Sequence, residues 1–166
     1  VGTWAAEASR FTPDLRVVTI AETHKRRRSE LADAVGGAHI VLTSYTLLRL
    51  EAEAYAGLEW SAVLLDEAQF VKNHASKAYQ AVRRLRARVK VALTGTPLEN
   101  NLMDLWSLLS ITAPGLFPHP QAFTEAFRKP VEAGDADALA RLHRRIRPLV
   151  LRRTKAAVAA ELPDKQ

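Results

Sequence analysis

Residues 63–69 have the sequence Val63-Leu64-Leu65-Asp66-Glu67-Ala68-Gln69, in which an apolar run ends abruptly in two acids. A second apolar run ends in polar residues at Val91-Ala92-Leu93-Thr94-Gly95-Thr96-Pro97. Helices cover both faces of a parallel sheet, so its buried strands are apolar along their whole length. The polar residues that follow such a strand lie at the carboxyl edge of the sheet. The two stretches therefore predict an α/β fold with polar side chains gathered at one edge of a parallel sheet.

Strands and helices are predicted to alternate around these two stretches. The expected strands are residues 15–20, 39–43, 62–65 and 89–93. The expected helices are residues 3–11, a segment ending near Val35, residues 45–56 capped by Ser44, and residues 76–86. Strands separated by helices of this length indicate right-handed βαβ units and a parallel sheet.

The pattern changes after Pro97 and becomes helical. Residues 100–112 carry an apolar stripe at helical spacing, and prolines at 114, 118 and 120 interrupt the next stretch. Two more helical segments are expected at about 121–127 and 135–146. We therefore expect three parts: an α/β lobe over 1–112, a helical protrusion over 113–150, and the end of the lobe over 151–166.

Composition narrows the class of protein. The 166 residues are 48% hydrophobic, enough for one domain with a sizeable core. There is no cysteine, which excludes disulfides and thiolate metal sites, and the five histidines are scattered rather than paired at metal-ligand spacing. No apolar run is long enough to cross a bilayer and no signal-peptide layout is present, so a cytoplasmic location is expected, at the nucleoid of a bacterium or in the nucleus of a eukaryote.

The chain is basic, with 24 Lys and Arg against 18 Asp and Glu and a net charge of +6. A polyanionic partner and a merely Arg-rich soluble surface explain that balance about equally well. Basic residues cluster at 83–90, where a solvated surface is the simpler interpretation, and again at 141–155. The second cluster consists of Arg141, Arg144, Arg145, Arg147, Arg152, Arg153 and Lys155. The three tryptophans, at 4, 60 and 106, are expected in the core rather than as base-stacking residues.

Two adjacent carboxylates at a strand end suit nucleotide hydrolysis. Asp66 would hold Mg²⁺, usually through water, and Glu67 would position the attacking water. An Asp-Glu pair alone more often only begins a loop, but the preceding apolar run and the following Ala-Gln favour a functional site. In the second stretch, the hydroxyls of Thr94 and Thr96 can bond either to a nucleic-acid phosphate or to the acidic motif, and Gly95 permits close backbone approach.

The ordered set of motifs resembles the first RecA-like lobe of the Swi/Snf-type ATPases, double-stranded-DNA translocases of helicase superfamily two. The matching residues, which extend over essentially the whole chain, are Trp4-Ala5-Ala6-Glu7, Val41-Leu42-Thr43-Ser44-Tyr45, Leu64 to Gln69 with Val71-Lys72-Asn73, Leu93 to Leu102, Leu105 to Leu109, Leu151-Arg152-Arg153-Thr154-Lys155 and Glu161-Leu162-Pro163.

The resemblance implies a role for each motif. Asp66 and Glu67 match motif II, with ATP and Mg²⁺ as the expected cofactors, and Gln69 would link this motif to motif III. Thr94, Gly95 and Thr96 match motif III, which couples nucleotide state to DNA binding. Thr43, Ser44 and Tyr45 match motif Ib, which contacts the DNA backbone. Arg152, Arg153 and Lys155 match the basic stretch at the end of the lobe. Duplex DNA and a second RecA-like lobe are therefore the expected partners.

The 166 residues contain no Gly-x-x-x-x-Gly-Lys-Ser/Thr phosphate loop. The resemblance implies that this loop lies upstream and that the arginine finger lies in the second lobe downstream. We therefore expect the 166 residues alone to be inactive, marginally stable, and left with an unpaired sheet edge. The expected function is part of an ATP-dependent duplex-DNA translocase. Another superfamily-two nucleic-acid helicase, or a degenerate non-enzymatic nucleic-acid-binding protein, is the alternative.

Overall fold

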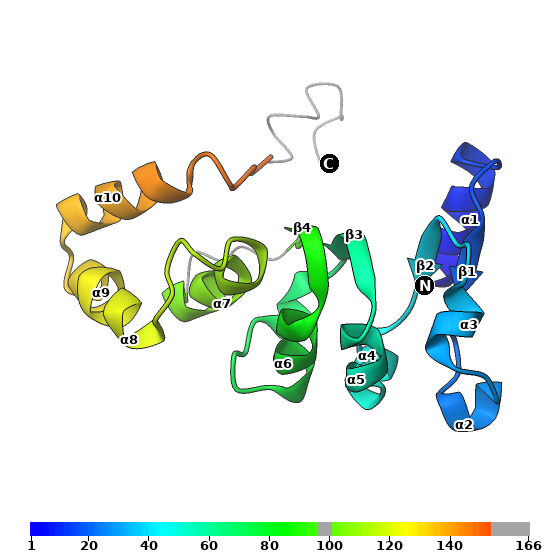
Figure 1. Cartoon of the computed structure of the whole chain (residues 1–166). Coiled ribbons are helices and arrows are strands. Elements are labelled where there is room, and N and C mark those ends of the chain that lie inside the picture. The colour runs from blue at the N-terminus through cyan, green and yellow to red at the C-terminus, as the bar shows by residue number, and fades with distance from the viewer. Residues whose placement is uncertain (96–100, 154–166) are drawn as a thin grey trace, which may run out of the picture. The chain divides into compact units, whose positions relative to one another are not determined.

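The computed structural model describes residues 1–95 and 101–153, and Figure 1 shows the order of its elements. The chain divides into two compact units, Val1–Pro120 and Gln121–Gln166. The first unit contains all four strands of the described residues, and the second is helical.

The four strands pair in parallel. β1 (Val17–Thr19) pairs with β2 (Ile40–Leu42), and β3 (Glu59–Leu65) lies beside β4 (Arg86–Ala92), as Figure 1 shows. The prediction of a parallel α/β arrangement is confirmed, although strand hydrogen bonding gives two two-stranded sheets in the described residues rather than one larger sheet. Two backbone hydrogen bonds of 2.8 Å, from Leu93 N to Leu65 O and from Ala68 N to Leu93 O, extend the β3–β4 pairing past the strand ends. They hold together the two loops that carry the predicted motifs.

The helices of the first unit follow the predicted order; the first begins one residue earlier than expected, and most of the others are shorter. They are α1 (Gly2–Phe11), α2 (His24–Arg27), α3 (Leu31–Val35), α4 (Tyr45–Leu50), α5 (Ala52–Ala56), the 3-10 turn η1 (Ala68–Val71), α6 (Lys77–Arg84) and α7 (Leu102–Thr112). The Ser44 side chain accepts a hydrogen bond from Leu47 N at 3.2 Å, so the predicted cap of α4 is present.

The prediction of one helix over residues 45–56 is wrong, because the helix breaks at Glu51, whose φ and ψ are −116° and 34°. The carboxylate of Glu51 accepts hydrogen bonds from the Arg27 guanidinium and from the backbone N–H of His24. These partners lie 24 and 27 positions away in the chain, and binding them places Glu51 outside the helical conformation. A tertiary contact therefore overrides local helix propensity at this residue.

The core of the first unit is built from α3, α4, α5, η1, α6, α7 and the buried face of the β3–β4 pair. Tyr79, Val82 and Ile111 are almost completely buried, and the Tyr79 hydroxyl and the Ser110 hydroxyl are 2.7 Å apart. Trp106 is buried as predicted, and its indole N–H donates to Phe117 O at 3.0 Å. Each of these polar atoms therefore has a hydrogen-bond partner inside the core, which burial requires.

The outer face of the β3–β4 pair is apolar and open. The register places Ala62 opposite Val89 and Leu64 opposite Val91, and the side chains of one such row share a face. Leu64 is 57% exposed and Val89 is 53% exposed. Within residues 1–95 and 101–153, β4 has β3 as its only strand partner. Among these residues β4 therefore has an open edge and an exposed apolar face.

The second unit is built from short helical segments. They are the last residues of α8 (Pro120–Phe123), the π-helical turn η2 (Thr124–Arg128), α9 (Lys129–Glu132) and α10 (Ala136–Ile146). Gly134 has a φ of +87°, which lets the chain reverse between α9 and α10, and Asp135 then caps α10 by accepting from Ala138 N at 2.9 Å. The buried side chains of the unit include Phe123, Phe127 and Leu142. No helix within the described part of the chain is long and apolar enough to span a membrane.

Candidate active site

The acidic pair lies directly after β3. Leu65 is 4% exposed and anchors the strand end, while Asp66 and Glu67 are both exposed. Glu67 has a φ of +49° and a ψ of 50°, a left-handed conformation that costs a non-glycine residue roughly 1 kcal/mol. Its backbone N–H donates to Asp66 Oδ1 at 3.0 Å, and the following Ala68 is fully buried. The turn is thus held from both sides.

Gln69 bridges the acidic pair and the second motif. Its amide N–H donates to Glu67 Oε2 at 2.7 Å, and its amide oxygen accepts from the Thr94 hydroxyl at 2.9 Å. One side chain therefore contacts a carboxylate through its donor and a hydroxyl through its acceptor. The Gln69 amide therefore connects the Thr94 loop with the Glu67 carboxylate.

Asp66 has two further contacts that the sequence did not indicate. The Trp4 indole N–H donates to Asp66 Oδ2 at 2.7 Å, and the Tyr45 hydroxyl donates to the Asp66 backbone oxygen at 2.8 Å. Burial, and then the charges of Asp66 and Glu67, raise the pKa of Tyr45 to about 12. The phenol is therefore a hydrogen-bond donor at neutral pH.

The prediction that Trp4 belongs to the core is wrong. Trp4 is 42% exposed, and none of the residues of α1 is buried. Helical periodicity cannot distinguish an indole that packs into a core from one that donates to a carboxylate 62 positions away. Trp60, by comparison, is partly buried, packs against the core and donates to Tyr55 O at 3.0 Å.

The predicted nucleic-acid-binding residues are divided between the two compact units. Thr43 accepts from the Tyr55 hydroxyl at 2.8 Å, and Ser44 caps α4, so both hydroxyls are used within the first unit. Arg152 and Arg153 are exposed and belong to the second unit. Thr96 and Lys155 lie outside the described residues. Gly95 has open space where a Cβ would stand, so the predicted close approach does not come from neighbouring protein atoms.

The donor set fits a magnesium ion that is shared with a nucleotide. Within the described residues, no group of three or more His, Cys, Asp or Glu side chains could enclose a metal. Mg²⁺ usually keeps several waters and binds one or two carboxylates together with substrate phosphates, so a single exposed Asp66 is a suitable protein ligand. Each Asp66 oxygen accepts one hydrogen bond and retains another lone pair for a metal-bound water.

A family model for the SNF2-related domain matches residues 1–166. The chain belongs to the SNF2-related family. The SNF2-related domain thus extends over both compact units, and the family uses nucleotide, which agrees with an acidic pair at a strand end. The resemblance to Swi/Snf-type ATPases is confirmed.

Curated SNF2-related proteins match the chain over nearly its whole length. They include helicase ssl-1 of Caenorhabditis elegans, 34% identical over 98% of this chain and 7% of the relative. The TATA-binding protein-associated factor mot1 of Aspergillus fumigatus is 35% identical over 99% of this chain and 9% of the relative. The putative ATP-dependent helicase/translocase YwqA of Bacillus subtilis is 35% identical over 99% of this chain and 18% of the relative. The chain therefore spans less than a fifth of the length of these relatives.

Solved SNF2-related structures confirm the fold. The Sulfolobus solfataricus SWI2/SNF2 ATPase core in complex with dsDNA is 36% identical, with a TM-score of 0.85 over 98% of this chain and 34% of that chain. The same ATPase core domain determined separately is 37% identical, with a TM-score of 0.80. The prediction of a RecA-like lobe is thereby confirmed for the chain as a whole.

Proposed function

We propose that this chain is part of an ATP-dependent motor that translocates on double-stranded DNA, and that Asp66 and Glu67 lie in its hydrolytic site. The observation that carries the proposal is the continuous contact from Glu67 through Gln69 to Thr94, beside Asp66, at the carboxyl edge of a parallel strand pair. Membership of the SNF2-related family and likeness to an ATPase core bound to dsDNA support the choice of nucleotide and nucleic acid.

In this proposal each residue of the acidic motif has a separate task. Asp66 holds Mg²⁺ through water, and the ion supplies charge stabilisation at the nucleotide phosphates. Glu67 accepts a proton from the attacking water and orients it. Gln69 fixes the carboxylate of Glu67 through its N–H at 2.7 Å. The two carboxylates have different hydrogen-bond partners, Trp4 for Asp66 and Gln69 for Glu67, which suits two different tasks.

The coupling to DNA is assigned to the Thr94–Gly95–Thr96 loop and to motif Ib. Tyr45 follows Thr43 and Ser44 directly and its hydroxyl contacts the backbone of Asp66, so a DNA strand that displaces this segment would also move the acidic motif. Arg152, Arg153 and Lys155 add positive charge for phosphate contacts. A DNA motor of this kind acts at the nucleoid of a bacterium or in the nucleus of a eukaryote.

The test is ATP turnover by the full-length gene product with magnesium, measured without nucleic acid, with duplex DNA, and with single strands of the same sequence. Stimulation by the duplex well above that by either single strand is the expected result. Equal stimulation by single strands, or by duplex RNA, would assign the protein to another class of superfamily-two enzyme. DNA binding without any turnover would support a degenerate, non-enzymatic relative and would contradict the proposal.

A further inference from the structure

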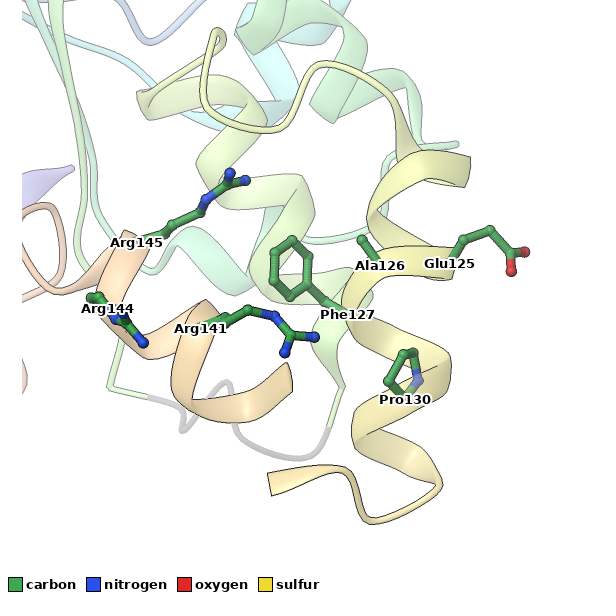
Figure 2. A pocket seen from close by; sticks show the side chains of 7 residues that line it. All are labelled: Glu125, Ala126, Phe127, Pro130, Arg141, Arg144 and Arg145. Carbon is green, nitrogen blue, oxygen red and sulfur yellow. The ribbon is translucent and has the colours of Figure 1, made fainter. Parts of the chain in front are cut away.

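The second unit contains a shallow, open hollow lined by its last three helical segments. The hollow has a volume of about 570 Å³. Its lining comes from η2, α9 and α10, and Figure 2 shows these side chains: Glu125, Ala126, Phe127, Pro130, Arg141, Arg144 and Arg145. The hollow belongs entirely to one compact unit and contains none of the residues of the acidic motif.

Three arginines of α10 line the hollow at positions i, i+3 and i+4, a spacing that places them on one helix face. Two carboxylates of the neighbouring segments are already paired. Glu125 pairs with Lys129 at 2.6 Å and points away from the hollow in Figure 2, and Glu132 pairs with Arg128 at 2.9 Å. Within the described part of the chain, no carboxylate is paired with any of the three arginines. Their positive charge is therefore open to an outside group.

Stabilisation of the α10 helix by basic side chains explains only two of the three arginines. Basic side chains in the last turn of a helix interact favourably with its dipole, and Arg144 and Arg145 lie in that turn. Arg141 lies a turn earlier, and in Figure 2 its guanidinium extends across the hollow toward the segment that carries Phe127. The helix dipole therefore does not account for Arg141 or for the direction of its side chain.

The floor of the hollow is apolar. Phe127 is only 7% exposed, and the Arg145 guanidinium lies 5.9 Å from the centre of its ring. A ring that is buried and already in contact with a cation is not a platform for a base, which excludes the aromatic stacking typical of single-strand binding sites. Ala126 and Pro130 continue the apolar lining beside it. The surface thus combines an apolar floor with a cationic rim.

We propose that this hollow binds an acidic peptide segment of a partner protein, with carboxylates on the Arg rim and one apolar side chain against Ala126 and Pro130, beside the buried Phe127 ring. Arginine forks match carboxylates in a bidentate way, and Arg and aromatic residues are enriched where binding energy concentrates in interfaces. Duplex DNA fits less well, because it presents phosphates and sugars on a wide convex rod and has no apolar group that could fill a concave floor. This inference does not depend on the motor function proposed above.

The test uses fluorescence anisotropy of a labelled peptide in which Asp-Glu pairs flank a single Leu, added to the full-length gene product. Arg141→Gln together with Arg144→Gln removes two rim charges but keeps the contact between Arg145 and Phe127. The matched control is Arg83→Gln with Arg86→Gln, which makes the same charge change on exposed arginines of the first unit. We expect the rim variant to bind the peptide roughly tenfold more weakly and the control to bind it normally.

A charge swap separates recognition from folding. Arg141→Glu with Arg144→Glu should lose the acidic peptide and gain a peptide with Lys-Lys pairs around the same Leu, which an unfolded α10 would not do. Three results would overturn the proposal: no binding of the acidic peptide by the unaltered protein, equal weakening in the control pair, or no gain of the Lys peptide on charge reversal. Weakened binding of a short DNA duplex by the rim variant, with the peptide ignored, would identify a nucleic-acid site instead.

Discussion

The bridge made by Gln69 allows a quantitative prediction. Replacing Gln69 with Ala removes the N–H that contacts Glu67 at 2.7 Å and the oxygen that accepts from Thr94 at 2.9 Å. A hydrogen bond to a charged group contributes about 1.5–3 kcal/mol when shielded, and Glu67 is exposed, so about 1 kcal/mol is appropriate here. The neutral contact with Thr94 adds about 0.5–1 kcal/mol.

The sum of about 1.5–2 kcal/mol corresponds to roughly a ten- to thirtyfold fall in duplex-stimulated turnover for Gln69→Ala, because about 1.4 kcal/mol is a factor of ten. Thr94→Val should lower it by a smaller factor. Since both changes break the same hydrogen bond, the double variant should show an interaction energy of about 0.5–1 kcal/mol rather than additive losses. Gln80→Ala, an exposed amide whose N–H donates to His74 O at 2.9 Å, is the matched control and should leave turnover unchanged.

The assay is steady-state ATP hydrolysis by the full-length gene product and the four variants at saturating duplex DNA. Strict additivity of the Gln69 and Thr94 changes would refute the bridge as a functional connection. An equal loss in the Gln80 variant would show instead that the first unit is generally sensitive to substitution.

Two further predictions concern stability and pH. Glu51 and Arg27 form a nearly buried ion pair, with side chains 9% and 13% exposed, and Glu51→Gln weakens it. Local opening of α4 and α5, measured by hydrogen exchange, should therefore become easier by about 2 kcal/mol. Glu53→Gln, in an exposed pair with Arg84, is the control and should leave exchange unchanged. Because the folded-state pKa of Tyr45 is about 12 and its ordinary value is 10.0, its hydroxyl stabilises the fold fully below pH 10 and loses that effect as pH rises toward 12. The difference in unfolding temperature between the unaltered protein and Tyr45→Phe should shrink over that interval, and a constant difference would contradict the assignment.

The sequence allowed the acidic site to be located because its signals are local. An apolar run that stops at Asp66, and a second that stops at Thr94, depend only on neighbouring residues and on parallel pairing. The link through Gln69 was implied only by the family resemblance, and its amide contacts both Glu67 and Thr94. The roles of these residues stay predictions until turnover is measured.

The features that the sequence missed depend on distant partners. The break at Glu51 arises from a contact with Arg27, and the exposure of Trp4 accompanies its hydrogen bond to Asp66. Neither contact has a signature at helical or strand spacing. The hollow on α10 was equally hidden, because a run of arginines has the same spacing whether its face meets solvent or a concave surface beside Phe127.

The central claim is that Glu67 activates water in a DNA-dependent ATPase, and Glu67→Gln in the full-length gene product tests it most directly. The substitution keeps the size of the side chain and removes its ability to accept a proton. Turnover at saturating duplex DNA should fall at least about a hundredfold, while ATP affinity stays within about a factor of two. Glu59→Gln, at the exposed start of β3, is the control and should turn over normally. Turnover of the Glu67 variant within a few-fold of the unaltered enzyme would contradict the account.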